Sequence, residues 1–134
     1  MPHPQANIGF LRTIIQHLDQ FFAPGEVDEI WIVHPDPRPR GRDEKRRLTS
    51  ERFLSLYAKI LSPGGILRLK TDDRDFFEYS LESVAHYGPK LIDSTYDLDR
   101  SELAAHHYDI TTHYGEKFRQ EQGRTLKYAW WKFP

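Results

Sequence analysis

Short apolar runs alternate with segments of helical periodicity, and this alternation constrains the fold of the 134-residue chain more than any other feature. Apolar side chains recur at helix spacing within residues 8–22, and Pro24-Gly25 ends that predicted helix. Residues 29–33 and 66–70 are apolar runs of strand type. Strands that alternate with helices favour parallel pairing through right-handed crossovers. The sequence therefore predicts an α/β fold.

Two further helices are predicted. One begins near residues 49–51, where a hydroxyl group can cap it and an acid lies in its first turn, and it ends at residues 63–65. The other stops at Gly88-Pro89. The buried faces of the two helices are predicted to comprise Phe53, Leu54, Tyr57, Ile60 and Leu61 in the first, and Phe77, Leu81 and Val84 in the second.

The chain is predicted to end in two strands without a long helix between them. One lies within residues 90–96, and the last, which is rich in aromatic residues, lies within residues 126–133. This spacing predicts an antiparallel ending to a mostly parallel sheet. Residues 97–110 show no clear pattern, and residues 112–119 predict a short helical turn.

Charge and composition exclude several classes of protein. Nineteen basic and twenty acidic residues give a formal charge of −1, so affinity for nucleic acid requires a local patch. The absence of cysteine excludes disulfides, thiolate metal sites and cysteine nucleophiles. No apolar run is long enough to span a membrane, and residues 1–4 do not form a secretory signal. These features predict a cytoplasmic protein without a membrane partner.

Acidic residues follow the first two predicted strands. Asp36 lies between two prolines after the first strand, and Asp72-Asp73 follow the second. Because ligands of open α/β sheets bind beyond the carboxyl ends of the strands, these residues are predicted to surround a shared crevice. Two alternatives stay open: Asp36 is a turn residue, or either Asp72 or Asp73 is the cap of the third helix.

A basic run starts directly after Asp36. Its six cations within ten residues are Arg38, Arg40, Arg42, Lys45, Arg46 and Arg47. Guanidinium groups at this density suit phosphate oxygens, although a solvated charged loop is the alternative. The histidines at 106, 107 and 113 form no helical pair of metal-ligand spacing, and no metal site is predicted.

The segment PDPRPRGRDEKRRLT, residues 35–49, resembles the signature of bacterial tRNA (guanine-N7) methyltransferases, roughly PDPWPKKRHxKRRLT. The resemblance continues in collinear order through residues 70–72, 77–81 and 112–118. It implies a Rossmann-like sheet and S-adenosylmethionine-dependent methylation of guanine N7 in tRNA, usually in the variable loop. The partner that it implies is tRNA, with Arg38, Arg42, Lys45, Arg46 and Arg47 as candidate contacts to the tRNA backbone.

The resemblance also implies roles for individual residues. Asp36 matches the acid of the cofactor and catalytic region, and Arg40 occupies the place of a substrate-binding lysine. Asp72 matches a substrate-binding aspartate. The family's Thr-x-x-Glu substrate motif falls on Thr112, His113, Tyr114 and Gly115, and Glu116, one residue later, is the alternative for its glutamate. The departures from the family pattern are Arg38 for tryptophan, Asp43 for histidine, and Gly115 for the glutamate of the motif.

Methyltransferases of this fold carry a glycine-rich turn after their first strand, and no Gly-x-Gly turn occurs here. In the resemblance, residue 1 falls after that turn. Residues 1–134 are therefore expected to form a single partial methyltransferase domain, with an incomplete S-adenosylmethionine site and no activity of its own. An unpaired strand edge near residues 29–33 would then favour a homodimer through that edge.

Two other functions are compatible with the sequence. One is a non-catalytic RNA-binding fragment or subunit that uses the basic loop, residues 38–47. The other is a magnesium-dependent nuclease in which Asp36, Asp72 and Asp73 hold the metal. The long collinear resemblance favours the methyltransferase.

Overall fold

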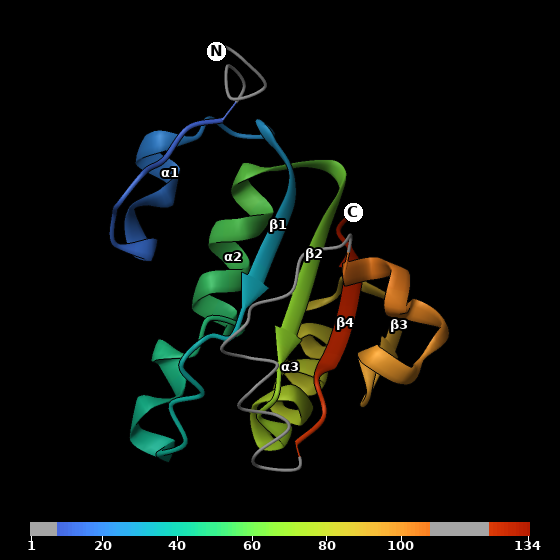
Figure 1. Ribbon diagram of the computed structural model, residues 1–134. Coiled ribbons are helices and arrows are strands. Elements are labelled where there is room, and N and C mark those ends of the chain that lie inside the picture. Colours follow the sequence, from blue (N-terminus) through green and yellow to red (C-terminus); the bar gives the residue numbers. More distant parts are fainter. Residues whose placement is uncertain (1–7, 108–123) are drawn as a thin grey trace.

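The computed structural model describes residues 8–107 and 124–134, which are built around a four-stranded sheet (Figure 1). The strands are β1 (Val27–Val33), β2 (Leu61–Thr71), β3 (Lys90–Thr95) and β4 (Lys127–Lys132). Their order across the sheet is β1-β2-β4-β3. β1 pairs parallel with β2, whereas β4 runs antiparallel to both β2 and β3. The predicted α/β sheet, mostly parallel with an antiparallel final strand, is confirmed.

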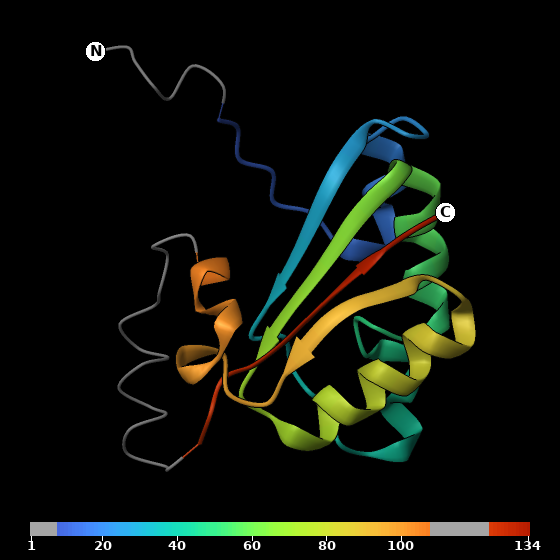
Figure 2. The same cartoon turned by 90° about the vertical axis from the view of Figure 1, so that its right-hand side faces the viewer.

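Helices cover the two faces of the sheet unequally (Figure 2). Helices α2 (Glu51–Ile60) and α3 (Arg74–Tyr87) lie on one face, with the short α1 (Leu18–Phe21) beside α2. The 3₁₀-helices η4 (Leu98–Arg100) and η5 (Glu102–His107) lie on the opposite face. The main core therefore forms between the sheet and the α-helices.

Side chains alternate across β2, and this alternation separates the core from a polar face. Leu67 and Leu69 are fully buried against the helices, whereas Arg68 and Lys70 point to the other face. The predicted face of α2 is confirmed, because Phe53, Leu54, Tyr57 and Ile60 are buried; Leu61 is buried too, as the first residue of β2. In α3, Phe77 and Val84 are buried, while Leu81 packs at the margin of the core.

The polar face is organised around Arg68, a residue that is only 8% exposed. Its guanidinium pairs with Glu29, donates to the hydroxyl of Tyr128 at 2.6 Å and lies 4.8 Å from the centre of the Trp130 ring. The Arg68 nitrogen that donates to Tyr128 also lies 3.1 Å from Nδ1 of His106 in η5. A buried cation needs such partners, and here they also hold η5 against the sheet.

The predicted N-terminal helix is wrong for its first half. Only the 3₁₀-helix η2 (Ile15–His17) and α1 are helical, and no helix covers residues 8–14. Ile8 and Leu11 are 57% and 50% exposed, whereas Ile15 packs against the core. A short helix depends on a surface that buries its apolar stripe, and only the later residues find one.

The start of α2 also differs from the prediction. Ser50 is the N-cap residue, but its hydroxyl donates to the carbonyl of Lys45 at 3.1 Å and does not cap the helix. The hydroxyl of Thr49 lies 2.7 Å from that of Ser80 in α3. Both hydroxyl groups therefore fix the preceding loop and α3, so the predicted hydroxyl cap is wrong.

The other helix and strand boundaries either agree with the predicted ranges or, for β2, extend beyond them. α2 ends at Ile60, before the predicted end at residues 63–65, and β2 begins at the next residue. β2 is therefore longer than the predicted strand of residues 66–70 and includes the predicted helix end. α3 ends as predicted at Gly88, whose φ of 130° suits glycine. β3 and β4 fall within their predicted ranges. The helical turn predicted at residues 112–119 lies outside the described residues.

Candidate functional site

Four segments meet at one edge of the sheet. β1, β2 and β3 run parallel and end there, so the residues that follow them lie at the same edge. β4 runs in the opposite direction and therefore begins at this edge. The acids after β1 and β2 consequently share an edge with the cationic residues that open β4.

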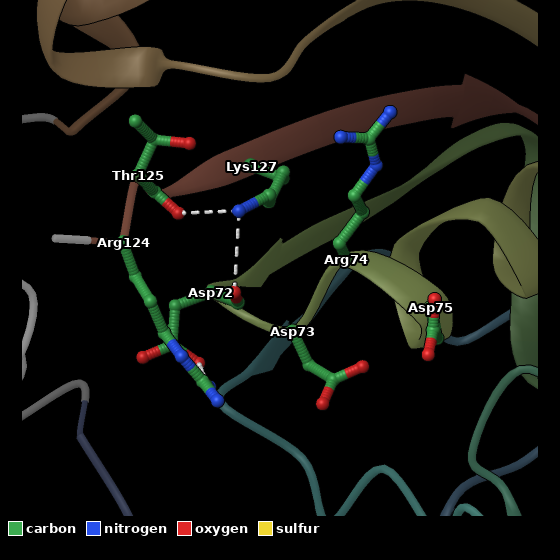
Figure 3. Close-up of a pocket in the computed structure, with 7 residues that line it drawn as sticks. All are labelled: Asp72, Asp73, Arg74, Asp75, Arg124, Thr125 and Lys127. Carbon is green, nitrogen blue, oxygen red and sulfur yellow. Dashed lines mark hydrogen bonds and ion pairs between the residues drawn. The ribbon is translucent and has the colours of Figure 1, made fainter. Parts of the chain in front are cut away.

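A pocket with a volume of about 350 Å³ opens at this edge (Figure 3). We call it the edge pocket, and its lining residues are Asp72, Asp73, Arg74, Asp75, Arg124, Thr125 and Lys127. Three acids and three cations are thus gathered with a hydroxyl group in one opening. Such a lining offers both donors and acceptors to a polar ligand.

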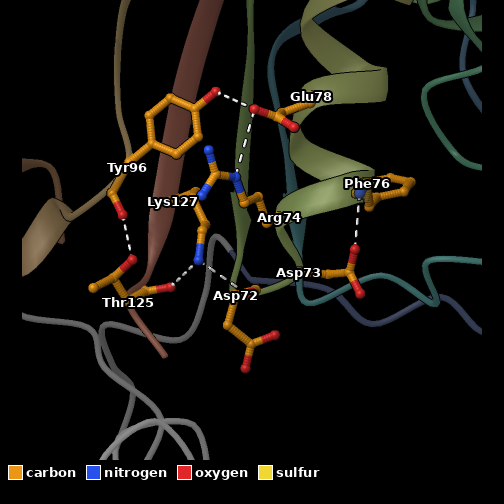
Figure 4. A network of polar contacts seen from close by, with 8 residues as sticks. All are labelled: Asp72, Asp73, Arg74, Phe76, Glu78, Tyr96, Thr125 and Lys127. Atoms are coloured by element: carbon orange, nitrogen blue, oxygen red, sulfur yellow. Dashed lines mark hydrogen bonds and ion pairs between the residues drawn. The ribbon is translucent and has the colours of Figure 1, made fainter. Parts of the chain in front are cut away.

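Lys127 joins β4 to the turn that carries Asp72 (Figure 4). Its Nζ donates to the carbonyl oxygens of Asp72 at 3.2 Å and of Thr125 at 3.0 Å. Burial lowers the pKa of Lys127, and the charge of Asp72 partly offsets this by raising it. The lysine thereby fixes the backbone of the Asp72 turn from the neighbouring strand.

The two adjacent acids have different roles. The Asp73 carboxylate accepts from the amide of Phe76 at 2.8 Å, so Asp73 caps α3 and the cap alternative is confirmed. The Asp72 carboxylate lies 3.8 Å from a guanidinium nitrogen of Arg124, and its side chain is 18% exposed. Of these two acids, Asp72 is therefore the one that a ligand in the edge pocket can reach without loss of a helix cap.

Arg74 contributes less charge to the edge pocket than its position suggests. Its guanidinium lies 3.6 Å from the Glu78 carboxylate and 5.5 Å from the centre of the Tyr96 ring (Figure 4). The Tyr96 hydroxyl donates to the same carboxylate at 2.9 Å, and this hydrogen bond raises the pKa of Tyr96. The Thr125 hydroxyl donates to the Tyr96 carbonyl at 2.5 Å, which ties β4 to the end of β3.

Asp36 lies in the loop after β1 and does not line the edge pocket. Its carboxylate accepts from the amide of Arg38 at 3.0 Å and lies 3.4 Å from the guanidinium of the same residue. Arg38 and His34 adopt positive φ values of 45° and 50°, a region that few residues other than glycine occupy. The side chain of Asp36 is 66% exposed, so the loop presents it to solvent.

Arg47 braces the basic loop from within. Its guanidinium donates to the carbonyl oxygens of Arg38 at 2.9 Å and of Pro39 at 3.5 Å. It also lies 4.5 Å from the centre of the Tyr79 ring in α3, and the Tyr79 hydroxyl donates to Glu44 at 3.0 Å. The sequence placed Arg47 among candidate phosphate contacts, whereas its contacts in the structure are to its own loop and to α3.

A second pocket, of about 570 Å³, lies between the segment before α1, the basic loop and the start of α2. We call it the arginine pocket, and its lining residues are Ile14, Ile15, Gln16, Arg38, Arg46, Leu48, Arg52 and Phe53. No acid is among them. Arg40, Arg42 and Lys45 are exposed on the 3₁₀-helix η3 (Gly41–Arg46) or just before it and line neither pocket.

Sequence reasoning missed Arg124 and Lys127, although the predicted direction of the last strand would have placed its first residues at the ligand edge. It also missed Arg52, which is separated from the basic run by the turn into α2. The predicted substrate residues Thr112, His113, Tyr114, Gly115 and Glu116 lie outside the described residues.

The residues at this edge fit an S-adenosylmethionine site only in part. The adjacent glycines, Gly64 and Gly65, lie near the start of β2 at the opposite end of the sheet. The cofactor contact predicted from the family resemblance, Asp36, lies in the loop after β1. Within residues 8–107 and 124–134, no three histidine or acidic side chains gather as a metal site. No helix in this described part is long and apolar enough to cross a membrane.

Comparisons with known proteins extend over nearly the whole chain. A family model described as "Putative methyltransferase" matches residues 4–128. A protein of Cytophaga hutchinsonii named tRNA (guanine-N(7)-)-methyltransferase is 42% identical over 129 residues, which are 95% of this chain and 58% of that protein. A protein of the same name from Geobacillus thermodenitrificans is 43% identical over 121 residues, 90% of this chain and 55% of that protein.

The chain thus spans about half the length of the curated relatives it matches. The crystal structure of the [4+2]-cyclase SpnF has a TM-score of 0.49 and 17% sequence identity, and covers 84% of this chain and 52% of that one. The match to the family model includes β2, all the residues that line the edge pocket and the whole basic loop. The resemblance predicted from residues 35–49 is confirmed, and the chain belongs to the methyltransferase family that this model describes.

Proposed function

We propose that this chain contributes the RNA-holding part of an enzyme that methylates guanine N7 in tRNA with S-adenosylmethionine. The observation that carries the proposal is the position of Asp72, in a pocket at the carboxyl end of β2, where Lys127 and Arg124 hold its turn and its carboxylate. The relatives' names supply the substrate class.

The chemistry of this reaction requires positioning more than proton transfer. Guanine N7 carries a lone pair, so no base has to remove a proton from it before it reacts. S-adenosylmethionine supplies the methyl group on a sulfonium centre. The purine becomes cationic as N7 is alkylated, and a carboxylate held nearby stabilises that charge. Most of the rate should therefore come from the orientation of the base and the placement of charge.

Asp72 is the proposed anchor for the guanine base. Guanine presents N1–H and an exocyclic amino group on one edge, and a carboxylate can accept hydrogen bonds from both. The edge pocket also offers Arg124 and Thr125 to acceptor atoms of the nucleotide. Asp36, which the loop presents to solvent, is the proposed catalytic residue and cofactor contact.

The other sequence predictions remain part of the proposal. Arg40 and the segment 112–116 are proposed substrate contacts on the strength of the family resemblance. Exposed cations of the basic loop are proposed to contact the tRNA backbone, namely Arg38, Arg42, Lys45 and Arg46. We exclude Arg47 from this set because its guanidinium is already bound to the loop and lies over Tyr79.

Methyl transfer is the direct test. Transcribed tRNA is incubated with S-adenosylmethionine and either this chain or the same chain joined to the uncovered remainder of the Cytophaga hutchinsonii relative. Nucleoside digests are then analysed by mass spectrometry for 7-methylguanosine. We expect the product with the joined protein. Its absence from both reactions, with both proteins folded, would refute the proposal.

A non-catalytic RNA-binding protein is the second candidate, because the described residues offer more to RNA than to the cofactor. Calorimetric titration with S-adenosylmethionine, with and without tRNA, separates the two. Salt-dependent binding of tRNA without cofactor binding or product would favour the RNA-binding protein. Cofactor binding in the micromolar range would favour the enzyme.

A homodimer through β1 is proposed as well. Within the described residues β1 pairs on one side only, with β2, and Val33 on this strand is 46% exposed. An unpaired strand edge is a ready surface for a second copy of the chain. Light scattering should show dimers at high protein concentration, and a monomer at every concentration would contradict this. We also propose a cytoplasmic location, on the strength of the proposed tRNA substrate.

A further inference from the structure

We infer that the arginine pocket binds the phosphodiester backbone of single-stranded RNA, at a site distinct from the edge pocket; the inference rests on the proposed function. Three guanidinium groups line this pocket from two elements. Arg38 and Arg46 come from the basic loop, and Arg52 comes from the first turn of α2. Since no acid lines the pocket, the sum of these charges favours an anion.

Each of the three guanidinium groups retains donors for a ligand. Arg38 and Arg46 lie 3.4 and 3.9 Å from acids at 36 and 43, distances that leave most of their donors unused. Arg52 lies 4.8 Å from the centre of the Phe53 ring and, within the described part of the chain, has no carboxylate partner. Guanidinium groups bind phosphate oxygens in bidentate fashion, so this set suits a phosphodiester.

The start of α2 adds a second reason for an anion. Ser50 turns its hydroxyl toward the basic loop, and no described side chain caps this helix. The first amide groups of a helix attract negative charge when no side chain caps them. α2 runs for ten residues, and Arg52 lies in its first turn beside these amides.

The shape of the pocket favours a nucleotide backbone over an isolated ion. A volume of about 570 Å³ lies within the range of small-molecule sites, which is roughly 300–1,000 Å³. Its apolar lining residues are Ile14, Ile15, Leu48 and Phe53. Phe53 is the one aromatic residue among them, and it is only 3% exposed and therefore cannot stack on a base. A pocket that offers guanidinium groups without an accessible aromatic ring holds the backbone without reading the base.

The position of the pocket connects it to the proposed chemistry. Arg38 both lines the arginine pocket and contacts both carboxylate oxygens of Asp36. Because Arg38 lies two residues from Asp36 in the same loop, a phosphate bound to Arg38 is held beside the segment that presents Asp36. This adjacency favours RNA over a membrane surface or a phosphopeptide as the occupant.

The test uses the full chain and a short oligouridylate, which contains no guanine and therefore cannot be methylated at N7. Binding is measured by fluorescence anisotropy over a series of salt concentrations. The variants are Arg52→Gln and Arg46→Gln, with Arg100→Gln as the matched control, because Arg100 is an exposed arginine on the opposite face of the sheet. Circular dichroism confirms that each variant is folded.

We expect each pocket variant to bind about three- to fivefold more weakly at low salt, as the loss of one exposed ion pair implies. The slope of log K against log salt should fall by about 0.7, the value for one phosphate contact on a single strand. Arg100→Gln should leave both unchanged. Equal slopes in all four proteins, or no binding of oligouridylate by the unaltered chain, would overturn the inference. Either result would leave methyl transfer to tRNA, and hence the proposed function, to be decided by its own assay.

Discussion

The edge pocket and the arginine pocket differ in how their charges are arranged. In the edge pocket each cation is engaged with an oxygen of the protein: Lys127 with two carbonyl groups, Arg124 with Asp72, and Arg74 with Glu78. In the arginine pocket Arg38 and Arg46 also lie 3.4 and 3.9 Å from acids, at 36 and 43, but neither acid is among its lining residues, whereas three acids line the edge pocket. A charge-balanced site suits a neutral polar group with donors and acceptors, such as a base edge. A cationic site suits phosphate.

The elements that build the two pockets differ as well. The edge pocket is formed by the ends of paired strands and by a capped helix, so hydrogen bonds fix its side chains. The arginine pocket is formed by a loop and by the start of α2, which no described side chain caps. Rigid elements support specific recognition, whereas long flexible side chains suffice for a backbone that every nucleotide shares. We therefore expect base preference to depend on the edge pocket and salt dependence on the arginine pocket.

The largest effect is expected for Asp72→Asn. RNA with one guanine in a uridine tract is compared with the same RNA carrying inosine, which lacks the exocyclic amino group. A hydrogen bond to a charged acceptor contributes about 1.5–3 kcal/mol, so the unaltered chain should prefer guanine by about 10- to 100-fold. The variant should lose most of this preference. Asp75→Asn is the control, because Asp75 lines the same pocket but is exposed on α3. Loss of the preference in the control alone would contradict the assignment.

A smaller effect is expected for Arg47→Gln. The change removes two hydrogen bonds to loop carbonyls and the contact with Tyr79, so it should lower the free energy of unfolding by about 1–2 kcal/mol. Urea denaturation measures this loss. Because Arg47 braces the loop without contacting phosphate, the salt slope of RNA binding should stay unchanged. A slope that falls as it does for Arg46→Gln would make Arg47 a phosphate contact after all.

The smallest effect is expected in the pH dependence of folding stability, and it comes from His106, which lies outside both pockets. Burial lowers the pKa of His106, and the charge of Arg68 lowers it further. Because the folded-state pKa lies below the ordinary value, the stabilisation is present above about pH 6.5 and is lost as the pH falls through the folded-state pKa. Protonation of Nδ1 would remove its ability to accept from Arg68 or the Tyr128 hydroxyl, a loss of about 1 kcal/mol or less.

Urea midpoints at pH 7.5 and pH 5.0 measure this effect. His106→Asn keeps an acceptor without a titratable ring, so it should show a smaller fall in stability at low pH than the unaltered chain. His86→Asn, at the exposed end of α3, is the control and should retain the full pH dependence. An unchanged pH dependence in His106→Asn would show that other groups cause the loss.

The parts of the fold that sequence could predict are those set by local pattern. The buried stripe of α2 and the end of α3 at Gly88 follow from spacing and from backbone preference. The predicted N-terminal helix is wrong over residues 8–14 because Ile8 and Leu11 have helical spacing but remain exposed, with no surface to bury them. Periodicity reports which side chains prefer burial, and it cannot report whether the rest of the chain provides a surface for them.

The candidate site was predictable only where its residues are close in sequence. Asp72 follows its strand directly, whereas Lys127 reaches the same turn from a strand 55 residues later. The insertion of β4 between β2 and β3 is a long-range pairing that periodicity does not specify. Composition could not distinguish Arg47 from Arg46. The guanidinium of Arg47 binds carbonyl groups of its own loop, whereas that of Arg46 lines the arginine pocket.

The measurement that tests the division between the two pockets most directly combines base preference and salt slope in one set of proteins. The unaltered chain, Asp72→Asn and Arg52→Gln are titrated with the guanine and inosine RNAs at several salt concentrations. Asp72→Asn should lose the guanine preference and keep the salt slope, and Arg52→Gln should keep the preference and lower the slope by about 0.7. If either variant changed both quantities together, or if the two effects were exchanged, the pockets would not divide base and backbone recognition.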